Sequence, residues 1–339
     1  MIDLPQPYLL FLGDTTSAPL AKTAFGLRDW APEQCLGEYA LPAATVTTRL
    51  PRLTPAQAKA QGARGLVIGV APIGGALAPS WVPALVEALE AGLDIISGMH
   101  MRLESVPQLQ EAASRLGRRL INVRQPPAVL PIANGRKRTG MRLLTVGTDC
   151  ALGKKYTALT IASEFKKRGV AAEFRATGQT GIMISGRGLP LDSVVADFVA
   201  GAAETLSPDA APDHWDIVEG QGSVFHPAYA GVSLGLLHGT QPDVIVMCHA
   251  VGRDRVLGLE HYATPSIAEA IELTLTLARR TNPRVRCAGV SLNTSQLDAA
   301  TARDVVSKQS AKLGGMPVAD PLRYGPELDR LISACLEVA

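Results

Sequence analysis

A run of glycines and lysines between two expected elements has the residues of a phosphate-binding loop. The stretch LLTVGTDCALGKKYTAL (143–159) leads from an apolar segment through a turn with Gly147 and Gly153 to Lys154, which opens an amphipathic segment. In such a turn, successive backbone N–H groups and the positive end of the following helix form an anion site. The lysine adds a charge that can reach a diphosphate. The order of these features predicts a phosphate-binding loop.

The residue after Lys154 departs from the usual motif G-x-x-x-x-G-K-[ST], in which a hydroxyl binds Mg²⁺. Here that residue is Lys155, and Thr157 could reach a metal only if the helix start is shifted. We therefore predict that phosphates are bound but not cleaved. Coenzyme A fits, because Lys155 would contact its 3′-phosphate; no metal ligand is assigned, and Mg²⁺ is not expected to be essential. The predicted cofactor-binding residues of the loop are Gly147, Thr148, Asp149, Cys150, Gly153, Lys154, Lys155, Tyr156 and Thr157.

Four features resemble dethiobiotin synthetase and related P-loop enzymes. Five residues separate Gly147 from Gly153, one more than in the common motif, after a GTD start. Glu219 ends the segment WDIVEG before further glycines, where an acid in those enzymes faces the phosphates or their Mg²⁺. Asn293 in GVSLNTS is similar to a strand-end asparagine that contacts a purine base, and PVADP fits the loop that follows. Together these features favour an adenine nucleotide-type ligand.

Longer motifs extend the resemblance along nearly the whole chain. They are LAKTAFGLRDWAPEQCLGEY, GLDIISGMHMRL, NVRQPP, GTDCALGKKYTAL, GQTGIMISGRG, VVADFVAGAAE and PVADPLRYG. Together they resemble the D-glutamate N-acetyltransferases of the DgcN type, a family long described only as a domain of unknown function. The resemblance implies a Rossmann-like N-terminal domain, a P-loop C-terminal domain and acetyl transfer from acetyl-CoA to the amine of D-glutamate or a related D-amino acid.

Acetyl transfer to an amine needs a base for the ammonium, alignment with the thioester and stabilisation of the oxyanion. Glu219, expected at a strand end beside the loop, is the first candidate for the base, with a metal- or loop-positioning role as the alternative. Asp149 is the second candidate and could instead cap the following helix. His226 has a side chain whose ordinary pKa suits base work near neutrality, and the same holds for His249. A structural role is the alternative for both histidines.

D-Glutamate carries two carboxylates, so arginines are expected at its site. Arg175 and Arg253 are the predicted substrate-binding residues, ranked above Arg187 and Arg255, with surface salt bridges as the alternative. Cys150 could carry an acyl group, because a helix N-terminus lowers a thiol pKa. Packing of a small residue in a tight turn is the interpretation we favour for Cys150.

Alternating strand and helix patterns must position these residues. In the N-terminal part, strands are expected at 64–70, 93–98 and 118–124, and helices at 81–92 and 105–117. Ser105 is the expected N-cap and Gly117 the expected end of the second helix. The alternation predicts a Rossmann-like parallel sheet in residues 1–134, without a dinucleotide fingerprint.

The alternation restarts after a stretch rich in Pro, Gly and charge. Strands are expected at 141–147, 170–178, 214–220, 242–250 and 285–293, and helices at 154–169, 190–206 and 266–280. We predict a linker at 135–140 and a P-loop NTPase-like parallel sheet of dethiobiotin synthetase type in residues 141–339. The chain is thus predicted to be an α/β protein of two domains.

Composition limits the classes of function. Of the 339 residues, 47% are hydrophobic, 19% charged and 4% aromatic, and the net charge is +2. These values argue against nucleic-acid or membrane partners. Five dispersed cysteines indicate a reducing compartment, and the N-terminus lacks a signal-peptide pattern. The uncharged run 65–86 is not expected to be a transmembrane helix, because prolines interrupt it. We expect a cytoplasmic homo-oligomer that acts on a small-molecule substrate.

Two alternatives to an acetyltransferase stay open. An ATP- and Mg²⁺-dependent ligase or kinase of dethiobiotin synthetase type is favoured by the loop spacing, Glu219 and Asn293, and disfavoured by Lys155. A non-catalytic nucleotide-binding protein would bind its ligand without turnover. Nucleotide binding that Mg²⁺ strengthens greatly would favour the ligase or kinase, and CoA binding without metal would favour the acetyltransferase.

Overall fold

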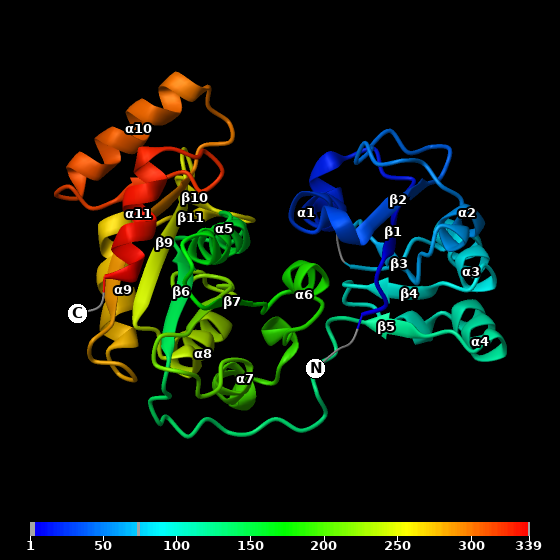
Figure 1. Ribbon diagram of the computed structural model, residues 1–339, viewed down its shortest axis with the longest axis horizontal. Coiled ribbons are helices and arrows are strands. Elements are labelled where there is room, and N and C mark those ends of the chain that lie inside the picture. The colour runs from blue at the N-terminus through cyan, green and yellow to red at the C-terminus, as the bar shows by residue number, and fades with distance from the viewer. Residues whose placement is uncertain (1–3, 73–74, 338–339) are drawn as a thin grey trace. The chain divides into compact units, whose positions relative to one another are not determined.

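The computed structural model describes residues 4–72 and 75–337, which form two compact units (Figure 1). The first unit contains the chain up to Pro127 together with Gly178–Ser193, and the second contains the rest. Each unit is built around its own parallel sheet. The predicted α/β class with two sheets is confirmed.

A five-stranded sheet forms the centre of the first unit, in the order β2-β1-β3-β4-β5, and all neighbouring strands are parallel. Its strands are β1 (Tyr8–Gly13), β2 (Cys35–Ala40), β3 (Gly65–Ile68), β4 (Asp94–Ser97) and β5 (Leu120–Asn122). The predicted strands correspond to β3, β4 and β5, whereas β1 and β2 lie outside the predicted pattern. Every residue of β1 is buried, as is typical of a parallel strand that is covered on both faces.

The helices of the first unit include both predicted ones. They are α1 (Lys22–Trp30), α2 (Pro55–Ala60), α3 (Val82–Glu90), α4 (Pro107–Leu116) and α6 (Gln179–Ser185). The prediction that Ser105 caps α4 is wrong, because the helix begins at Pro107 with Val106 as its cap residue. Proline suits this first position because it has no N–H to satisfy. Gly117 ends α4 in a left-handed conformation with φ +63°, as predicted.

The segment Gly178–Ser193 packs in the first unit, although the sequence pattern places it within 141–339. Thr180 of α6 shares a buried hydrogen bond of 3.1 Å with Thr23 of α1. A Cβ added at Gly98 would lie 2.7 Å from Cγ of Gln179, so the helix packs directly against the backbone there. The chain therefore returns to the first unit to form α6. The predicted domains 1–134 and 141–339 place this helix in the second domain.

A six-stranded parallel sheet forms the centre of the second unit, in the order β13-β12-β9-β6-β8-β7. Its strands are β6 (Met141–Gly147), β7 (Ala172–Arg175), β8 (Trp215–Val218), β9 (Val244–Ala250), β12 (Arg286–Asn293) and β13 (Val318–Ala319), and β10 (Arg255–Val256) pairs separately with β11 (Leu259–Ala263). All but β13 of the six were predicted. Because β6 lies between β8 and β9, the loop that follows β6 starts at the middle of the sheet edge.

The helices of the second unit are α5 (Lys154–Lys167), α7 (Val199–Leu206), α8 (Ala230–Thr240), α9 (Ile267–Ala278), α10 (Ala299–Lys312) and α11 (Pro326–Leu336). The helix predicted at 190–206 is correct only in its last part, α7. Short 3-10 turns occur at Ala18–Ala21, Pro32–Gln34, Pro79–Trp81, Leu103–Ser105, Leu191–Ser193 and Ala196–Phe198. In the described part of the chain, no helix has the length and apolar character needed to span a bilayer.

The predicted linker at 135–140 is held firmly by the second unit. Arg138 is buried, and its guanidinium donates to the carbonyls of Ser207 at 2.6 Å and Gly239 at 2.7 Å. Lys137 pairs with Asp243 at 3.0 Å. The basic run therefore serves packing rather than forming a flexible joint.

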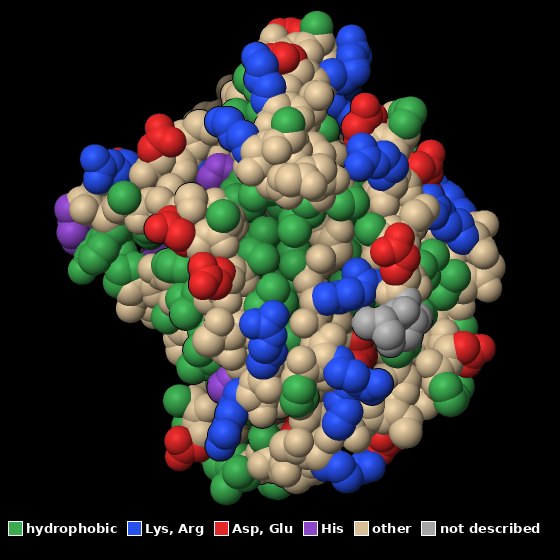
Figure 2. Space-filling view, turned by 90° about the vertical axis from the view of Figure 1, so that its left-hand side faces the viewer, with side chains coloured by type: hydrophobic (Ala, Val, Ile, Leu, Met, Phe, Trp, Pro, Cys, Tyr) green, Lys and Arg blue, Asp and Glu red, His purple; other side chains and the backbone are tan. Residues whose placement is uncertain are grey.

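On the face shown in Figure 2, Lys and Arg side chains are scattered rather than gathered into one stripe.

Candidate active site

The predicted phosphate loop joins the middle strand of the second sheet to α5. β6 ends at Gly147, and α5 begins at Lys154 with Gly153 as its cap residue. Gly153 has a φ of +111°, a left-handed conformation that glycine adopts without strain. Ala151 also has a positive φ, +53°. The turn is therefore tight, and it places the N-terminus of α5 at the carboxyl end of the sheet.

Lys154 lies inside this loop. Its side chain is only 6% exposed, and Nζ donates to the carbonyl of Asp149 at 2.8 Å. Burial lowers the pKa of Lys154, while nearby groups that include Glu219 act in the opposite direction. A phosphate within reach of Nζ would favour the charged form. The arrangement combines a buried cation with the N-terminus of a helix, as an anion site requires.

Asp149 ties the loop to the β10–β11 hairpin. Its carboxylate is fully buried and accepts hydrogen bonds from the N–H of Cys150 at 2.6 Å, from Nη1 of Arg253 at 2.9 Å and from the N–H of Leu257 at 2.8 Å. These contacts do not support a general base role. Asp149 is also not the cap of α5, because Gly153 occupies that position. Arg253, a predicted substrate-binding residue, thus lies at the loop with this carboxylate as its observed partner.

Glu219 follows β8 and faces the loop from the neighbouring strand. The side chain is 4% exposed, and Oε2 accepts the N–H of Thr177 at 3.0 Å. Thr177 in turn donates Oγ1 to the carbonyl of Glu219 at 2.7 Å and accepts Nε2 of Gln221 at 3.0 Å. These hydrogen bonds, together with burial, favour the positioning role of Glu219 over the general base role.

Replacing Glu219 with Gln tests this interpretation. Gln keeps an oxygen that can accept the Thr177 N–H but removes the charge. We therefore expect kcat for the acetyl transfer that the family resemblance implies to stay within about tenfold of the wild type. A general base would instead cost roughly 100-fold or more. The measurement is kcat across a pH series for both proteins. A 100-fold loss together with disappearance of one limb of the pH profile would assign Glu219 as the base.

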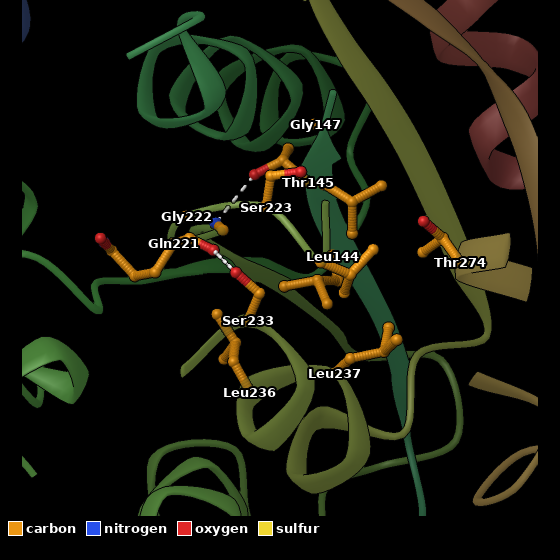
Figure 3. Close-up of a pocket in the computed structure, with 13 residues that line it drawn as sticks. Leu144, Thr145, Gly147, Gln221, Gly222, Ser223, Ser233, Leu236, Leu237 and Thr274 are labelled. Carbon is orange, nitrogen blue, oxygen red and sulfur yellow. Dashed lines mark hydrogen bonds between the residues drawn. The ribbon is translucent and has the colours of Figure 1, made fainter. Parts of the chain in front are cut away.

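The backbone after Glu219 passes very close to β6, and a small cavity lies beside it (Figure 3). A Cβ added at Gly220 would lie 1.7 Å from the carbonyl oxygen of Thr145, so only glycine fits. The N–H of Gly220 donates to Oγ1 of Thr145 at 3.0 Å. The cavity has about 20 Å³, room for one water molecule. It is too small for an acyl group or glutamate.

Three predicted residues meet at the loop. A carboxylate oxygen of Asp149, Sγ of Cys150 and a ring nitrogen of His226 all lie within 4.8 Å of one another. Such a set could hold a metal ion by its chemistry. However, Asp149 already pairs with Arg253, and Lys154 lies beside it. These two positive charges oppose a cation, so the residues do not fit a metal site. Burial raises the pKa of the Cys150 thiol, which does not favour a nucleophile.

His226 is fixed by its own turn. The ring is 3% exposed, and Nδ1 accepts the N–H of Ala228 at 3.1 Å. A backbone N–H can only donate, so in the neutral ring the proton is on Nε2. Nδ1 is therefore occupied and cannot accept a substrate proton. His226 can act as a hydrogen-bond donor, but the geometry does not support the base role.

His249 has a different kind of partner. Its Nδ1 lies 2.8 Å from Oγ1 of Thr148. Burial lowers the pKa of His249, and the charge of Asp254 acts in the opposite direction. Because a hydroxyl can both donate and accept, this ring can change protonation without losing its hydrogen bond. Of these two histidines, His249 is the one whose contacts permit proton transfer.

The other predicted cofactor-binding residues lie on both sides of the loop. Nζ of Lys155 is 5.0 Å from the centre of the Tyr156 ring at the start of α5. Thr157 is buried, and its Oγ1 lies 2.8 Å from Oγ of Ser291. This hydroxyl faces β12 and does not replace the missing metal ligand. Asn293 ends β12 at the same sheet edge, where its Oδ1 accepts the N–H of Ser295 at 3.1 Å.

Arg175 does not join the site. Its guanidinium pairs with Asp216 at 2.8 Å and with Glu173 at 2.9 Å. Asp216 is the second residue of β8, away from the carboxyl end where the loop lies. His214 also contacts Asp216, at 3.1 Å. These contacts do not support the prediction that Arg175 binds substrate.

Several residues that position the site were not among those predicted from the sequence. Thr145 and Thr177 fix the segment after β8, and Ser291 holds the Thr157 hydroxyl. Tyr229 stacks on His226 with ring centres 4.5 Å apart. A hydroxyl two residues before a strand-end glycine was a usable signal for Thr145. The other contacts join segments that are distant in the sequence.

A glycine-bearing loop with a buried lysine, at the carboxyl end of a central parallel strand, has the form of a P-loop, and the other unit of this chain is a separate parallel sheet flanked by helices. Comparison with known proteins agrees. Residues 131–331 match the domain of unknown function DUF1611_C, a P-loop domain, and residues 34–126 match DUF1611_N, a Rossmann-like domain. The chain belongs to the DUF1611 family.

Similar proteins cover the chain almost completely. A D-glutamate N-acetyltransferase of Tritonibacter scottomollicae is 46% identical over 99% of this chain and 100% of its own. A second D-glutamate N-acetyltransferase, from a Pseudoalteromonas species, is 45% identical over 96% of this chain and 97% of its own. The crystal structure of a DUF1611 family protein from Anabaena variabilis superimposes with a TM-score of 0.86 at 32% identity, covering 98% and 99% of the two chains. The family resemblance predicted from the motifs is confirmed.

Proposed function

We propose that this protein transfers the acetyl group of acetyl-CoA to the amine of D-glutamate. The observation that carries the proposal is the 45–46% identity, over nearly the full length, to two proteins named D-glutamate N-acetyltransferase. At this level of identity, with almost complete coverage of each chain, we expect the substrate site to be retained. The acetyl donor and the role of the loop are inferred from the residues of the site.

In this proposal the loop binds the phosphates of CoA. Lys154 and the N-terminus of α5 contact the diphosphate, and Asn293 lies at the adenine side. The absence of a hydroxyl at position 155 and the burial of Thr157 against Ser291 support binding without Mg²⁺. These features argue against the ATP-dependent alternative, in which a hydroxyl next to the lysine binds the metal.

The reaction forms one bond and breaks another at the thioester carbon. The neutral amine of D-glutamate attacks the carbonyl, a C–N bond forms and the C–S bond breaks. The nitrogen then passes a further proton to the departing sulfur, so that the amide forms and CoA leaves as its thiol. The ammonium proton must be removed by a base that contacts the amine. Glu219, Asp149 and His226 are fixed by protein hydrogen bonds. We therefore infer that these three residues position the loop, and that another group removes the proton.

Thiol release from acetyl-CoA tests the function directly. A thiol reagent would follow CoA release with D-glutamate and with L-glutamate in parallel, and a blank without substrate corrects for the protein's five cysteines. We expect release that requires the D isomer and neither ATP nor Mg²⁺. Absence of release with both isomers would overturn the proposal, and ATP turnover with Mg²⁺ would then identify a ligase or kinase.

Lys155 gives a second, more specific test. If its ammonium contacts the 3′-phosphate, wild-type protein should bind CoA about tenfold more tightly than 3′-dephospho-CoA, the usual worth of one charge-assisted contact. The variant Lys155→Ala should lose most of this preference and leave binding of 3′-dephospho-CoA unchanged. Calorimetric titration of both ligands measures it. Equal weakening of both ligands would place Lys155 at the diphosphate instead.

A further inference from the structure

An exposed aromatic ring lies next to the phosphate loop. Tyr229 is 52% exposed, whereas His226, on which it stacks with ring centres 4.5 Å apart and planes 32° apart, is 3% exposed. A ring nitrogen of His226 lies within 4.8 Å of Sγ of Cys150 in the loop. His226 thus lies between the exposed tyrosine ring and the proposed phosphate loop. We call Tyr229 and His226 the aromatic stack.

Hydrogen bonds and close contacts hold the turn that carries the aromatic stack. His226 is held by the Ala228 N–H, as described above, and its own N–H donates to the carbonyl of Ser223 at 3.0 Å. Ser233 of α8 donates Oγ to the carbonyl of Gln221 at 2.8 Å (Figure 3). A Cβ added at Gly222 would lie 3.1 Å from Cβ of Tyr229 and 2.6 Å from Oγ of Ser233. The turn that carries the ring is therefore tightly packed, and a preorganised backbone lowers the entropy cost of binding a ligand.

The strand order places this stack opposite the adenine side. Asn293 ends β12, which is separated from β6 by β9, and the turn that carries Tyr229 follows β8, the neighbour of β6 on its other side. The carboxyl ends of parallel strands form one edge. A ligand with its adenine at Asn293 and its diphosphate at the loop reaches the carboxyl end of β8 when it continues in the same direction along this edge.

We propose that the aromatic stack binds the pantetheine arm of acetyl-CoA. The inference rests on the proposed function, because it takes the loop as the site of the CoA phosphates. The arm consists of an apolar dimethyl group and two amides, a chain that packs well on the face of an aromatic ring. It also separates the diphosphate from the thioester by many bonds. The reacting carbon then lies beyond Tyr229 rather than inside the loop, in agreement with the fixed contacts of Glu219 and Asp149.

A comparison of two ligands distinguishes contacts to the pantetheine arm from contacts to the nucleotide. Acetyl-CoA carries both, and adenosine 3′,5′-bisphosphate carries the nucleotide without the arm. We expect Tyr229→Ala to weaken acetyl-CoA binding about tenfold, the loss typical of one ring contact, and to leave the bisphosphate unchanged within about twofold. Tyr229→Phe keeps the ring and should bind acetyl-CoA as the wild type does. Calorimetric titration without turnover measures all of these affinities.

Tyr324 supplies the matched control. It is 63% exposed and stacks on Lys167 at the far end of α5, about 20 Å along the helix from the loop. Tyr324→Ala should bind both ligands as the wild type does. Equal weakening of both ligands by Tyr229→Ala, or no weakening of either, would overturn the proposal. If wild-type protein binds neither ligand, the proposed function itself fails, and this outcome is distinct from an effect at Tyr229.

Discussion

Replacing Lys154 with Met should weaken acetyl-CoA binding by about 100-fold, because it removes the one buried ammonium of the loop and its charge-assisted contact with phosphate. Turnover at subsaturating acetyl-CoA should fall in proportion. The stability of the folded protein should not decrease. Met has a similar volume, and burying an ammonium is unfavourable in the absence of a ligand. The thermal midpoint is therefore expected to stay unchanged or to rise.

The comparison that isolates this effect is Lys166→Met. Lys166 is exposed in the last turn of α5, so its replacement lowers the net charge by the same amount without touching the loop. Titration of acetyl-CoA and a thermal melt on both variants separate binding from stability. Unchanged acetyl-CoA affinity in Lys154→Met would show that the loop is not the phosphate site, even if the protein still acetylates D-glutamate.

The loop could be predicted because its signals are contiguous. Strand, glycines, lysine and helix follow one another within residues 143–159, and each has a local physical cause. The departure at Lys155 was equally visible. What the sequence did not reveal was the fate of Thr157, because its partner Ser291 is far away in the chain. Local chemistry was predictable, and the contacts that decide which side chains are available were not.

The predicted domains 1–134 and 141–339 do not include the return of α6 to the first unit, for a related reason. The helix α6 has a local pattern that suits either unit, and only its buried contacts, such as Thr180 with Thr23, place it in the first. The run GRKRTG resembles a linker by composition, yet Arg138 is buried. Composition reports the average behaviour of residue types. A buried arginine is rare, so composition assigned this stretch to the surface.

Arg175 shows the same limit at the level of a single side chain. Its position near the end of a strand suggested a carboxylate-binding role, and it does bind carboxylates, those of Asp216 and Glu173. These observed partners belong to the protein, whereas the prediction concerned the carboxylates of the substrate. Arginine has one recognition geometry for ligand and protein carboxylates alike, so residue type alone cannot separate the two. The strand register, which points the side chain towards Asp216, decides it.

The largest stability effect is expected at Arg142, in the strand that leads to the loop. The side chain is 1% exposed, and Nε donates to Oγ of Ser207 at 2.8 Å. The guanidinium also donates to five backbone carbonyls, those of Arg138, Thr139, Gly140, Ser207 and Pro208. Arg142→Met would leave these oxygens without their donor inside the protein. We expect the free energy of unfolding to fall by about 4 kcal/mol, because several buried carbonyls lose their donor and each such loss costs about 1–3 kcal/mol.

Urea unfolding of the wild type, Arg142→Met and Arg168→Met measures this effect. Arg168 pairs with Asp329 on the surface at 2.8 Å, and Asp329 is 72% exposed, so its replacement should cost less than about 1 kcal/mol. A similarly small loss for Arg142→Met would mean that water reaches these carbonyls and replaces the guanidinium. The predicted linker would then be a loosely held segment. A large loss would show that these residues anchor the first strand of the P-loop unit and thereby the position of the loop itself.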